Sequence, residues 1–553
     1  MNTSWTGPED VVFPGTMMDE PLLLKSIVER AEAMFGDQTL VSYTDDGPTE
    51  MTYAELVSRV RRLASALVKQ GIGVGDRVAT FAWNIREHLE LYLAVPSIGA
   101  VLHPLNIRLH QSELSYIMEH AGDSMVVMED RLADRLPRPG DHVREVVIGG
   151  AVAGRPEALA YEELIESGDP DFEFPRIPEH SACTMCYTGG TTGSPKGVVY
   201  THRSTVLHTI LESLPDYYGI RESDVVVPFV PMFHANAWGL PYAALMTGAK
   251  LVLPGAVTAP EKIAQMLSEQ RATFAAGVPT IWHGVGELRE LPDLSSLRMV
   301  VAGGAPLSEA FLKRYDELGI PVIQGFGMTE ANPLLAVGSV PARSKAQGEE
   351  LLRIRQSQGR LLPFVDFRID EASGGELQLR GPTIAAGYYN APEVTSEKFT
   401  EDGWMRTGDV AEVSPEGIVR IVDRTKDLIK SGGEWIPSVE LEDAIVSHPA
   451  VNEAVVVAVS DARWGERPAA FVVLRPDARL DAEELRAHLA ERVAKWWIPD
   501  LIEFTDAIPR TSIGKLDKKV MRVRAAEVVD RRQASPEGRE PDTVTATKEK
   551  QER

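Results

Sequence analysis

The stretch Tyr187–Val198 has the residue types that bind a polyphosphate. It reads YTGGTTGSPKGV, with four glycines, four threonine or serine hydroxyls and one lysine. Glycine lets backbone N–H groups approach phosphate oxygens, hydroxyls add hydrogen-bond donors, and lysine adds positive charge. In a Walker A loop the lysine directly follows the last glycine, whereas here Ser194 and Pro195 precede Lys196. The stretch therefore predicts a phosphate-binding loop, and it excludes the P-loop kinases and GTPases.

Such a loop must be held by regular elements. Amphipathic helical patterns alternate with short β-branched runs along the chain, which predicts an α/β fold. The segment 182–187 reads as a strand that leads into the loop. The segment 298–302 reads as a second strand, followed by a glycine turn at 303–304 and a helix over 307–318. Ligand sites in such sheets lie where strands end and glycine turns begin. The glycine turn at 303–304 is therefore a candidate part of a ligand site.

One helix can be predicted residue by residue. Thr52 and Glu55 form a capping box at its start, and Gly71 marks its end. We expect a surface helix whose apolar stripe packs on a sheet. The residues that recur on this stripe at 3.6-residue spacing are Leu56, Val57, Val60, Leu63, Ala64, Leu67 and Val68.

Length and composition exclude several classes of protein. The 553 residues suffice for three or four packing units of roughly 100–200 residues each. The chain has 57 Lys+Arg residues against 81 Asp+Glu, a net charge of −24, and so acidic a surface repels nucleic acid. The uncharged stretch Leu91–Ile107 is shorter than a bilayer span and contains two prolines. The first ten residues have neither a basic nor an apolar region, so we expect no signal peptide.

The two cysteines, Cys183 and Cys186, form a C-x-x-C arrangement. Because both lie in the strand predicted at 182–187, we expect their side chains on opposite faces. We therefore predict two separate buried thiols and not a redox pair or a zinc site. So few cysteines exclude a disulfide framework and indicate a reducing, cytoplasmic location.

Two boundaries divide the chain into domains. A glycine- and charge-rich stretch follows the strand predicted at 418–422, and a new α/β pattern begins after it. We predict an N-terminal domain over 1–423, a hinge at 424–427 and a small C-terminal domain over 428–530. The segment 531–553 has no aromatic and almost no apolar residue, which predicts a disordered tail.

Five further segments with polar and glycine residues follow the phosphate loop along the chain. Together with that loop, they resemble the adenylate-forming superfamily of acyl-CoA synthetases, peptide-synthetase adenylation domains and beetle luciferases. The resemblance runs from about Leu22 to Arg524. Within the superfamily, the run Pro231–Tyr242 and the segment 431–436 most resemble bacterial medium- and long-chain fatty acyl-CoA synthetases. The five segments are Gln324–Glu330 (QGFGMTE), Thr407–Asp409 (TGD), Asp423–Asp427 (DRTKD), Lys430–Ile436 (KSGGEWI) and Pro509–Lys515 (PRTSIGK).

The resemblance implies a reaction in two halves. A carboxylate attacks the α-phosphorus of ATP, which gives an acyl-adenylate and pyrophosphate. A thiolate, normally that of coenzyme A, then displaces AMP to give the thioester. The first half is a substitution at phosphorus, so its catalysis would depend mainly on positioning and charge neutralisation.

The resemblance also assigns residues to the nucleotide. Phe326 would lie against the adenine, Asp409 would accept both ribose hydroxyls, and Arg424 would reinforce Asp409. The residues that would bind the cofactors are Thr188, Gly189, Gly190, Thr191, Thr192, Gly193, Lys196, Gly303, Gly304, Ala305, Gln324, Gly325, Phe326, Gly327, Asp409, Arg424, Lys430, Gly432, Gly433, Glu434 and Trp435.

A metal site and one departure from the family pattern concern the phosphates. Glu330 and Thr192 would hold Mg²⁺, a hard cation that prefers a carboxylate plus phosphate oxygens, and Thr329 would donate to the α-phosphate. Gly189 replaces the serine often found at that loop position, which removes one hydroxyl contact to phosphate. The other loop residues remain.

Lys515 is the principal catalytic candidate. Its compact charge would bridge the attacking carboxylate and the phosphate oxygen as negative charge builds between them. The alternative is a solvated lysine beside Lys518 and Lys519. A rotation of the small domain is also implied, because Lys515 and the segment 432–433 cannot occupy one site together. Lys426 would be the pivot of that rotation, or else a surface charge in a turn.

The acyl pocket is assigned by the same resemblance. His234 would lie at its carboxylate end, and Trp238 would gate a tunnel for the acyl chain. Either residue could instead be a packed core residue. Val278 and Pro279 would form further walls.

We therefore expect an α/β protein with a large N-terminal domain of several subdomains and a small, mobile α+β C-terminal domain. The expected activity is an ATP-dependent acyl-CoA ligase for a medium or long fatty acid, with ATP, Mg²⁺ and coenzyme A. Alternatives are a ligase for a short sulfur-containing or aryl carboxylate, transfer of the acyl-adenylate to an amine or a carrier-protein thiol, and a silent nucleotide-binding protein. Retention of Glu330, Asp409 and Lys515 argues against the last. We expect no nucleic-acid partner, and homodimer formation and peripheral membrane contact stay open.

Overall fold

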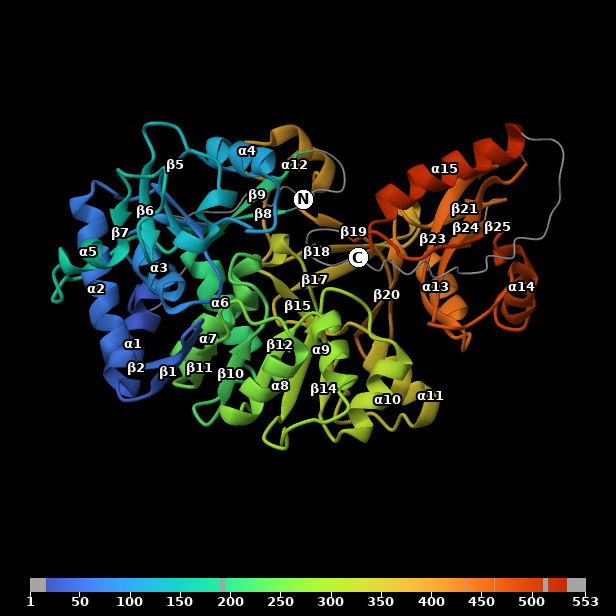
Figure 1. Ribbon diagram of the computed structural model, residues 1–553, viewed down its shortest axis with the longest axis horizontal. Coiled ribbons are helices and arrows are strands. Elements are labelled where there is room, and N and C mark those ends of the chain that lie inside the picture. Colours follow the sequence, from blue (N-terminus) through green and yellow to red (C-terminus); the bar gives the residue numbers. More distant parts are fainter. Residues whose placement is uncertain (1–15, 189–193, 433, 462, 511–515, 535–553) are drawn as a thin grey trace, which may run out of the picture. The chain divides into compact units, whose positions relative to one another are not determined.

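The computed structural model describes residues 16–188, 194–432, 434–461, 463–510 and 516–534 (Figure 1). Contacts within the chain divide it into two compact units. Unit 1 comprises Met1–Arg368, Gln378–Arg406 and Val413–Val419. Unit 2 comprises Ile369–Leu377, Thr407–Glu412 and Arg420–Arg553. Residues 369–377 and 407–412 thus group with the C-terminal part, whereas the sequence places them in a domain over 1–423; the domain limits stay a prediction.

The first sheet of unit 1 has a parallel centre with helices packed around it (Figure 1). Its neighbours run in the order β16-β15-β14-β13-β12-β10-β11-β1-β2, and every pair from β14 to β1 is parallel. The strands β1-β2, β14-β15 and β15-β16 pair antiparallel. The bounds are β1 (Thr39–Thr44), β2 (Gly47–Thr52), β10 (Val225–Pro228), β11 (Lys250–Leu253), β12 (Phe274–Gly277), β13 (Met299–Gly303), β14 (Val322–Gly327), β15 (Leu334–Val337) and β16 (Gly359–Leu361).

The second sheet of unit 1 contains the two strands on either side of the predicted phosphate-binding loop. Its order is β7-β6-β5-β3-β4-β8-β9, parallel throughout except for the antiparallel pair β8-β9. The bounds are β3 (Arg77–Phe81), β4 (Val101–Pro104), β5 (Asp123–Glu129), β6 (Arg144–Ile148), β7 (Leu159–Ala160), β8 (Ala182–Thr188) and β9 (Lys196–Thr201).

The helices of unit 1 include the one predicted in detail. Helix α2 (Tyr53–Lys69) has the expected capping box, in which Glu55 N–H donates to Thr52 Oγ1 at 3.2 Å and Thr52 N–H donates to Glu55 Oε2 at 2.7 Å. The others are α1 (Leu24–Phe35), α3 (Arg86–Ser97), α4 (Gln111–Ala121), η2 (Asp130–Arg135), α5 (Tyr161–Glu166), α6 (His202–Glu212), η3 (Ala235–Gly239), α7 (Leu240–Thr247), α8 (Pro260–Glu269), α9 (Pro279–Gly286), α10 (Glu309–Glu317), η4 (Thr329–Ala331), α11 (Gly348–Gln356) and α12 (Pro392–Lys398).

Two of the sequence predictions need correction. Val68 was expected on the buried stripe of α2 but is 45% exposed, because it lies in the last turn and at the edge of the stripe. The disordered tail was expected from 531, yet α15 (Lys518–Ala534) continues to 534. Residues 531–534 include neither glycine nor proline, so nothing in the local sequence stops the helix before Pro536.

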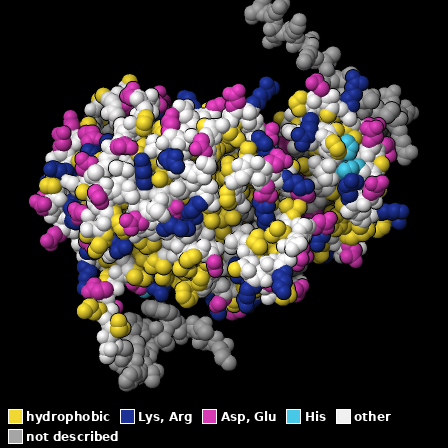
Figure 2. Space-filling view, turned by 90° about the horizontal axis from the view of Figure 1, so that it is seen from below, with side chains coloured by type: hydrophobic (Ala, Val, Ile, Leu, Met, Phe, Trp, Pro, Cys, Tyr) yellow, Lys and Arg dark blue, Asp and Glu magenta, His cyan; other side chains and the backbone are white. Residues whose placement is uncertain are grey.

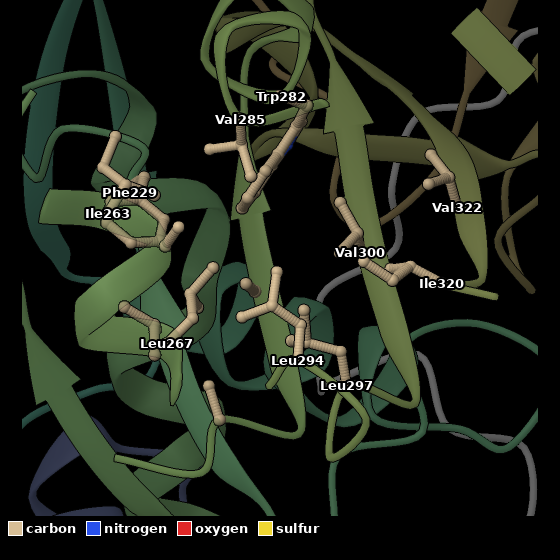
Figure 3. Packing of buried hydrophobic residues seen from close by; sticks show 14 of the residues in the cluster. Phe229, Ile263, Leu267, Trp282, Val285, Leu294, Leu297, Val300, Ile320 and Val322 are labelled. Atoms are coloured by element: carbon tan, nitrogen blue, oxygen red, sulfur yellow. The ribbon is translucent and has the colours of Figure 1, made fainter. Parts of the chain in front are cut away.

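An apolar cluster holds the parallel strands of the first sheet to the helices beside them (Figure 3). Trp282 of α9 lies fully buried in this cluster, and its indole N–H donates to the carbonyl of Val301 in β13 at 3.1 Å. Tyr315 of α10 in turn donates its hydroxyl to the carbonyl of Trp282 at 2.6 Å. These hydrogen bonds join α10 to α9 and α9 to β13, after which candidate site residues follow. Further members are Phe229, Ile263, Leu267, Val285, Leu294, Leu297, Val300, Ile320 and Val322.

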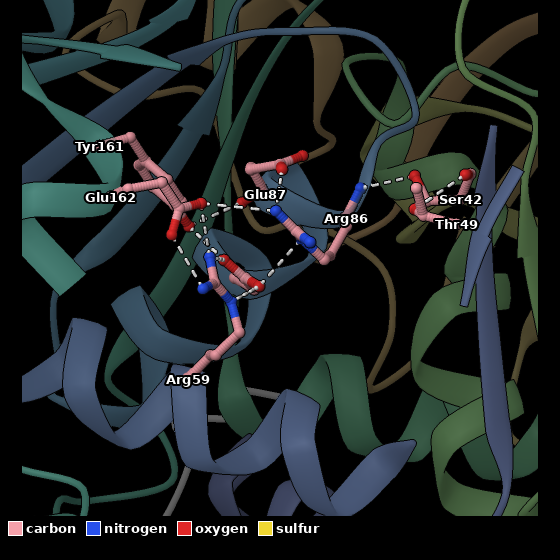
Figure 4. A network of polar contacts seen from close by, with 8 residues as sticks. Ser42, Thr49, Arg59, Arg86, Glu87, Tyr161 and Glu162 are labelled. Carbon is pink, nitrogen blue, oxygen red and sulfur yellow. Dashed lines mark hydrogen bonds and ion pairs between the residues drawn. The ribbon is translucent and has the colours of Figure 1, made fainter. Parts of the chain in front are cut away.

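A buried ion-pair network connects three helices of unit 1 (Figure 4). Glu90 of α3 is inaccessible to solvent and accepts from Arg59 Nε of α2 at 2.6 Å and from the Tyr161 hydroxyl of α5 at 2.8 Å. Arg59 also pairs with Glu162 at 2.8 Å. Burial raises the pKa of Glu90 in spite of its arginine partners. These contacts offset the free-energy cost of burying the Glu90 carboxyl group.

Four strands contain residues of both units, namely β17 (Asp366–Asp370), β18 (Glu376–Arg380), β19 (Met405–Val413) and β20 (Ile418–Arg424). The remainder of unit 2 is a sheet in the order β22-β21-β24-β23, with β25 parallel to β24. Successive residues of β23 alternate between its faces: Val456 packs with α13 and α14, and Val455 packs with α15. The bounds are η5 (Glu371–Ser373), β21 (Ile429–Ser431), β22 (Glu434–Ile436), α13 (Ser438–Val446), β23 (Val451–Asp461), β24 (Gly465–Leu474), α14 (Ala482–Ala490), η6 (Lys495–Trp497) and β25 (Leu501–Phe504).

The two cysteines are separate buried thiols, as predicted. Cys183 and Cys186 lie in β8, and neither forms a disulfide. Burial raises the pKa of Cys183 to about 11 and that of Cys186 to about 12, so both stay protonated at neutral pH.

The surface shows acidic and basic side chains scattered among apolar ones on the face in Figure 2. Within the described residues, no helix is both long and apolar enough to cross a lipid bilayer.

Three buried histidines of unit 1 predict how its stability depends on pH. Burial lowers the pKa of His88 and His202 to about 4 and that of His208 to about 3, from an ordinary value of 6.5. The unfolded chain therefore binds more protons than the folded chain between these values, and each histidine lowers the free energy of unfolding as the pH falls from 6.5 towards 4. Carboxyl groups with raised pKa, such as Glu90, act in the opposite direction.

The histidine contribution is thus measured as a difference between variants. His88 lies between the Thr80 hydroxyl (2.8 Å) and the carbonyl of Trp83 (2.9 Å), and glutamine can supply one acceptor and one donor there. A His88→Gln variant should lose less stability than the parent between pH 7 and pH 5, by about 2 kcal/mol at pH 5. Thermal unfolding across this range measures it. Parallel curves for the two proteins would contradict the assignment.

Candidate active site

The sequence-predicted residues of unit 1 gather after the carboxyl ends of adjacent parallel strands. His234 and Trp238 follow β10, and Val278 and Pro279 follow β12. The turn at 304–305 follows β13. Thr329 and Glu330 follow β14. Since β10, β12, β13 and β14 are neighbours in this order, segments up to a hundred residues apart meet at one edge of the sheet.

The antiparallel strands β8 and β9 lie at the two ends of the predicted phosphate-binding loop. Thr188, the last residue of β8, lies opposite Lys196, the first residue of β9. Tyr187 lies opposite Gly197 in the same register. The predicted loop residues Gly189, Gly190, Thr191, Thr192 and Gly193 lie outside the described residues. The structure therefore brings the two ends of the loop together across one pair of strands.

Thr329 and Glu330 are each held by a tyrosine from another segment. The Tyr200 hydroxyl of β9 donates to the carbonyl of Thr329 at 2.6 Å. The Tyr388 hydroxyl donates to Glu330 Oε1 at 2.5 Å. Burial and the Glu330 charge raise the pKa of Tyr388, so its hydroxyl remains a donor at neutral pH.

The neighbouring strands β13 and β14 both end in glycine residues. Gly303 lies opposite Gly325 in the parallel pair. A Cβ added at Gly303 would lie 2.8 Å from the ring of Trp238, and one added at Gly327 would lie 2.2 Å from the carbonyl of Pro333. Gln324 beside them is buried. The structure thus places Trp238 against the strand end that carries Gly303, Gly304 and Ala305.

A left-handed turn presents Trp238. Ala235, Asn236, Ala237 and Trp238 have φ angles of 43°, 56°, 49° and 57°, and Gly239 follows at 82°. Four consecutive non-glycine residues in this region cost roughly 1–2 kcal/mol each. Backbone strain of this kind persists where the surroundings over-determine it, often at functional sites. Here Asn236 is buried and accepts from the Tyr92 hydroxyl at 3.4 Å. His234, half-buried, immediately precedes the turn.

In unit 2, Asp409 and Arg424 are in contact as expected from the motifs. Arg424 Nε lies 2.7 Å from Asp409 Oδ1, with Asp409 buried in β19 and Arg424 exposed at the end of β20. The Asp409 N–H donates to the Thr407 hydroxyl at 3.0 Å, which fixes the backbone of the T-G-D segment. A carboxylate that is held by an arginine in this way can accept hydrogen bonds from the two hydroxyls of a diol.

A pocket of about 250 Å³ lies in unit 2 beside the K-S-G-G-E-W segment. Gly432 has φ +63° and donates its N–H to the carbonyl of Trp464 at 2.8 Å, and a Cβ there would lie 2.8 Å from the Trp464 ring. Only glycine satisfies both demands without strain. Lys430 lies 5.2 Å from the ring centre of Trp435. Gly433 lies outside the described residues. The pocket is lined by Ser431, Gly432, Glu434, Trp464, Arg467 and Trp496.

The structure describes the predicted hinge residue Lys426 but not the predicted catalytic residue Lys515. Lys426 lies in the turn between β20 and β21, where its carbonyl accepts from Arg522 of α15 at 3.2 Å. The Arg522 side chain also pairs with Asp427. Lys515 lies outside the described residues, and on either side of its loop Arg510 and Leu516 form a single antiparallel bridge.

Comparison with known proteins assigns the chain to a family. Residues 28–389 match the AMP-binding enzyme model, and residues 440–515 match the AMP-binding enzyme C-terminal domain model.

The chain belongs to the AMP-binding enzyme family.

Relatives of this AMP-binding enzyme include acyl-CoA ligases. It is 44% identical to a long-chain-fatty-acid–CoA ligase of Thermus thermophilus, over 92% of this chain and 97% of that protein. It is 38% identical to a 3-methylmercaptopropionyl-CoA ligase of Ruegeria lacuscaerulensis, over 92% and 98%. The crystal structure of the anthranilate CoA ligase AuaEII with anthranoyl-AMP superposes with a TM-score of 0.81 at 25% identity, over 93% and 99%.

The AMP-binding enzyme is therefore an ATP-using, adenylate-forming acid–thiol ligase that acts on a carboxylic acid. The predicted superfamily and the α/β architecture with a large N-terminal and a small C-terminal part are confirmed. The roles of individual residues and the preferred acid stay predictions.

Sequence reasoning missed several residues that contact the predicted ones. These are Tyr200 and Tyr388 around the T-E pair, and Trp464, Arg467 and Trp496 around the pocket of unit 2. Tyr200 lies 129 residues from Thr329, Tyr388 lies 58 from Glu330 and Arg467 lies 36 from Ser431, so nothing in their spacing connects them to these partners. The exposed side chains of Trp464 and Trp496 would have indicated a binding surface, but the sequence does not show which tryptophans are exposed.

Proposed function

We propose that this AMP-binding enzyme ligates a medium- or long-chain fatty acid to coenzyme A through an acyl-adenylate. The observation that carries the proposal is the 44% identity to a long-chain-fatty-acid–CoA ligase along nearly the whole chain. Trp238 against Gly303 supports it, because a large ring beside small residues can admit or exclude an acyl chain by moving.

In this proposal the sequence-predicted residues of both units serve the first half-reaction. Thr188 and Lys196 flank the loop for the β- and γ-phosphates, and Thr329 donates to the α-phosphate. His234 lies towards the carboxylate of the acid, with Val278 and Pro279 as walls of its pocket. Asp409 and Arg424 hold the ribose. These contacts act mainly by holding the reacting atoms in line and by neutralising charge.

The residues present suit a magnesium ion bound together with ATP. Glu330 supplies one carboxylate, and Mg²⁺ is usually held by one or two carboxylates with the remaining positions on phosphate and water. Bound there, the ion would neutralise charge on the phosphate oxygens. Thr192, the other proposed ligand, lies outside the described residues.

The pocket of unit 2 is the proposed entry of coenzyme A. Its tryptophans, Trp464 and Trp496, are 44% and 39% exposed, whereas Arg467 is buried and pairs with Asp500 at 2.6 Å. Exposed aromatic faces suit stacking against the base of a nucleotide. Gly432 leaves room for a narrow pantetheine arm, because any side chain there would meet the Trp464 ring.

The proposal is tested by measuring pyrophosphate release from ATP with straight-chain acids from butanoate to hexadecanoate, with and without coenzyme A. We expect the highest kcat/KM for a medium or long chain, and AMP and thioester formation only with coenzyme A present. A preference for 3-methylmercaptopropionate would favour a sulfur-containing short acid instead, in line with the 38% identical relative. Amide or carrier-protein products in place of the coenzyme A thioester would overturn the acceptor.

Trp238→Ala should change the acyl-chain profile more than the affinity for ATP. Each methylene that gains or loses burial is worth roughly 0.8 kcal/mol, or about fourfold in kcat/KM. Comparing kcat/KM along the same acid series with the KM for ATP measures this. If the profile is unchanged from butanoate to hexadecanoate, Trp238 is a packing residue.

A further inference from the structure

One segment of unit 1 contacts Glu330 through both side chain and backbone. Ala385 donates its N–H to the carbonyl of Glu330 at 2.7 Å, and the Tyr388 hydroxyl donates to Glu330 Oε1 at 2.5 Å. Tyr388 is itself fixed, because its own N–H donates to the hydroxyl of Thr395 in α12 at 3.0 Å. Both Glu330 and Tyr388 are half-buried. The carboxylate is thus held by a partner that cannot move freely.

The same segment is attached to the base of the phosphate-binding loop. Tyr389, the next residue, donates its N–H to the carbonyl of Gly197 at 2.8 Å. Gly197 follows Lys196 in β9 and lies opposite Tyr187 of β8. The ring of Tyr389 is 5.7 Å from that of His120, and His120 Nδ1 lies 2.7 Å from the Tyr187 hydroxyl. Two consecutive tyrosines therefore connect the Glu330 carboxylate to the strands on both sides of the loop.

We propose that Tyr388 is the positioning residue of the Glu330 carboxylate, which it orients for the metal ion bound with ATP. The inference rests on the proposed function, in which Glu330 is a metal ligand. Tyr388 occupies one carboxylate oxygen and leaves the other for the ion. Because the next residue is bonded to β9, the carboxylate is set relative to the phosphate-binding loop as well as to its own strand.

The physical reason is the freedom of an unheld glutamate. A half-buried glutamate on a short turn can adopt several rotamers, and each misplaced one must be corrected when the ion binds. A hydrogen bond from a fixed tyrosine removes that freedom in advance. Loss of such an outer partner of a metal ligand typically costs about 10–100-fold in metal affinity or activity.

The variant that tests this is Tyr388→Phe, which removes one hydroxyl and keeps the ring. Calorimetric titration of ATP in Mg²⁺ and in EDTA, without any acid present, gives the two dissociation constants. We expect the gain in ATP affinity due to Mg²⁺ to fall by about tenfold or more. Binding of ATP in EDTA should be unchanged, and so should thioester formation from preformed acyl-adenylate, which needs no ATP.

Two further variants make the result unambiguous. Tyr217→Phe removes another tyrosine hydroxyl bond of unit 1, to the carbonyl of Leu361 at 2.9 Å, and should bind MgATP like the parent. Glu330→Gln should lose the effect of Mg²⁺. If Glu330→Gln retains that effect, the metal role in the proposed function is wrong. If Glu330→Gln loses it and Tyr388→Phe does not, the positioning role of Tyr388 is wrong.

Discussion

Lys515→Ala is expected to abolish acyl-adenylate formation and to spare thioester formation from preformed acyl-adenylate. Lys515 is the proposed cation between the attacking carboxylate and the α-phosphate, and only the first half-reaction builds charge there. Loss of one positioned donor to developing charge costs about 3–4 kcal/mol, a factor of about 10²–10³ in rate. Pro509 and Asp517 lie on either side of the segment that contains Lys515, and the Asp517 N–H donates to the carbonyl of Pro509 at 2.8 Å.

The two half-reactions are measured separately, by pyrophosphate release and by thioester formation from synthetic acyl-adenylate. Lys519→Ala, in the first turn of α15, removes a nearby positive charge and should leave both rates within about twofold, as surface charges contribute little. Lys518 is unsuitable as a control because it pairs with Glu442 at 2.8 Å. Pyrophosphate release at the parental rate in Lys515→Ala would remove this lysine from the mechanism.

Lys426→Pro should leave adenylate formation near normal and lower thioester formation by about 100-fold or more. A domain rotation between the half-reactions must be absorbed by φ and ψ changes at a few linker residues. Proline fixes φ near −65° and restricts Thr425 before it, so one arrangement of the linker is trapped. The turn already makes several backbone contacts: Asp427 and Leu428 donate their N–H groups to the carbonyl of Arg424 at 2.9 Å.

Lys426→Ala is the matched control, because it removes the charge and keeps the backbone free. It should support both half-reactions if the pivot is a backbone property. Equal loss of both rates in Lys426→Pro would indicate misfolding, which thermal unfolding would detect. Normal rates in both halves would show that position 426 is not the pivot.

Local spacing was enough for much of the fold. The capping box of α2 joins residues three apart, and the strand predicted at 182–187 assigns Cys183 and Cys186 to opposite faces, so both can be predicted without knowing the neighbours. The glycine and hydroxyl composition after β8 predicted the loop, and six motifs in order identified the family. The end of the last helix was missed, because helix ends depend on small differences in local free energy.

The sequence by itself therefore determined the class of fold, the adenylate-forming chemistry and the candidate residues, since each depends on residue types at short spacing or on ordered motifs. Tertiary structure alone decided which of these residues meet. Tyr388 lies 58 residues from Glu330, and Arg467 lies 36 residues from Ser431, yet each pair is in hydrogen-bond contact. Val68 fits the apolar stripe of its helix but is exposed, because burial depends on what covers the helix. Such contacts follow from strand order and packing, which residues far apart in the chain determine together.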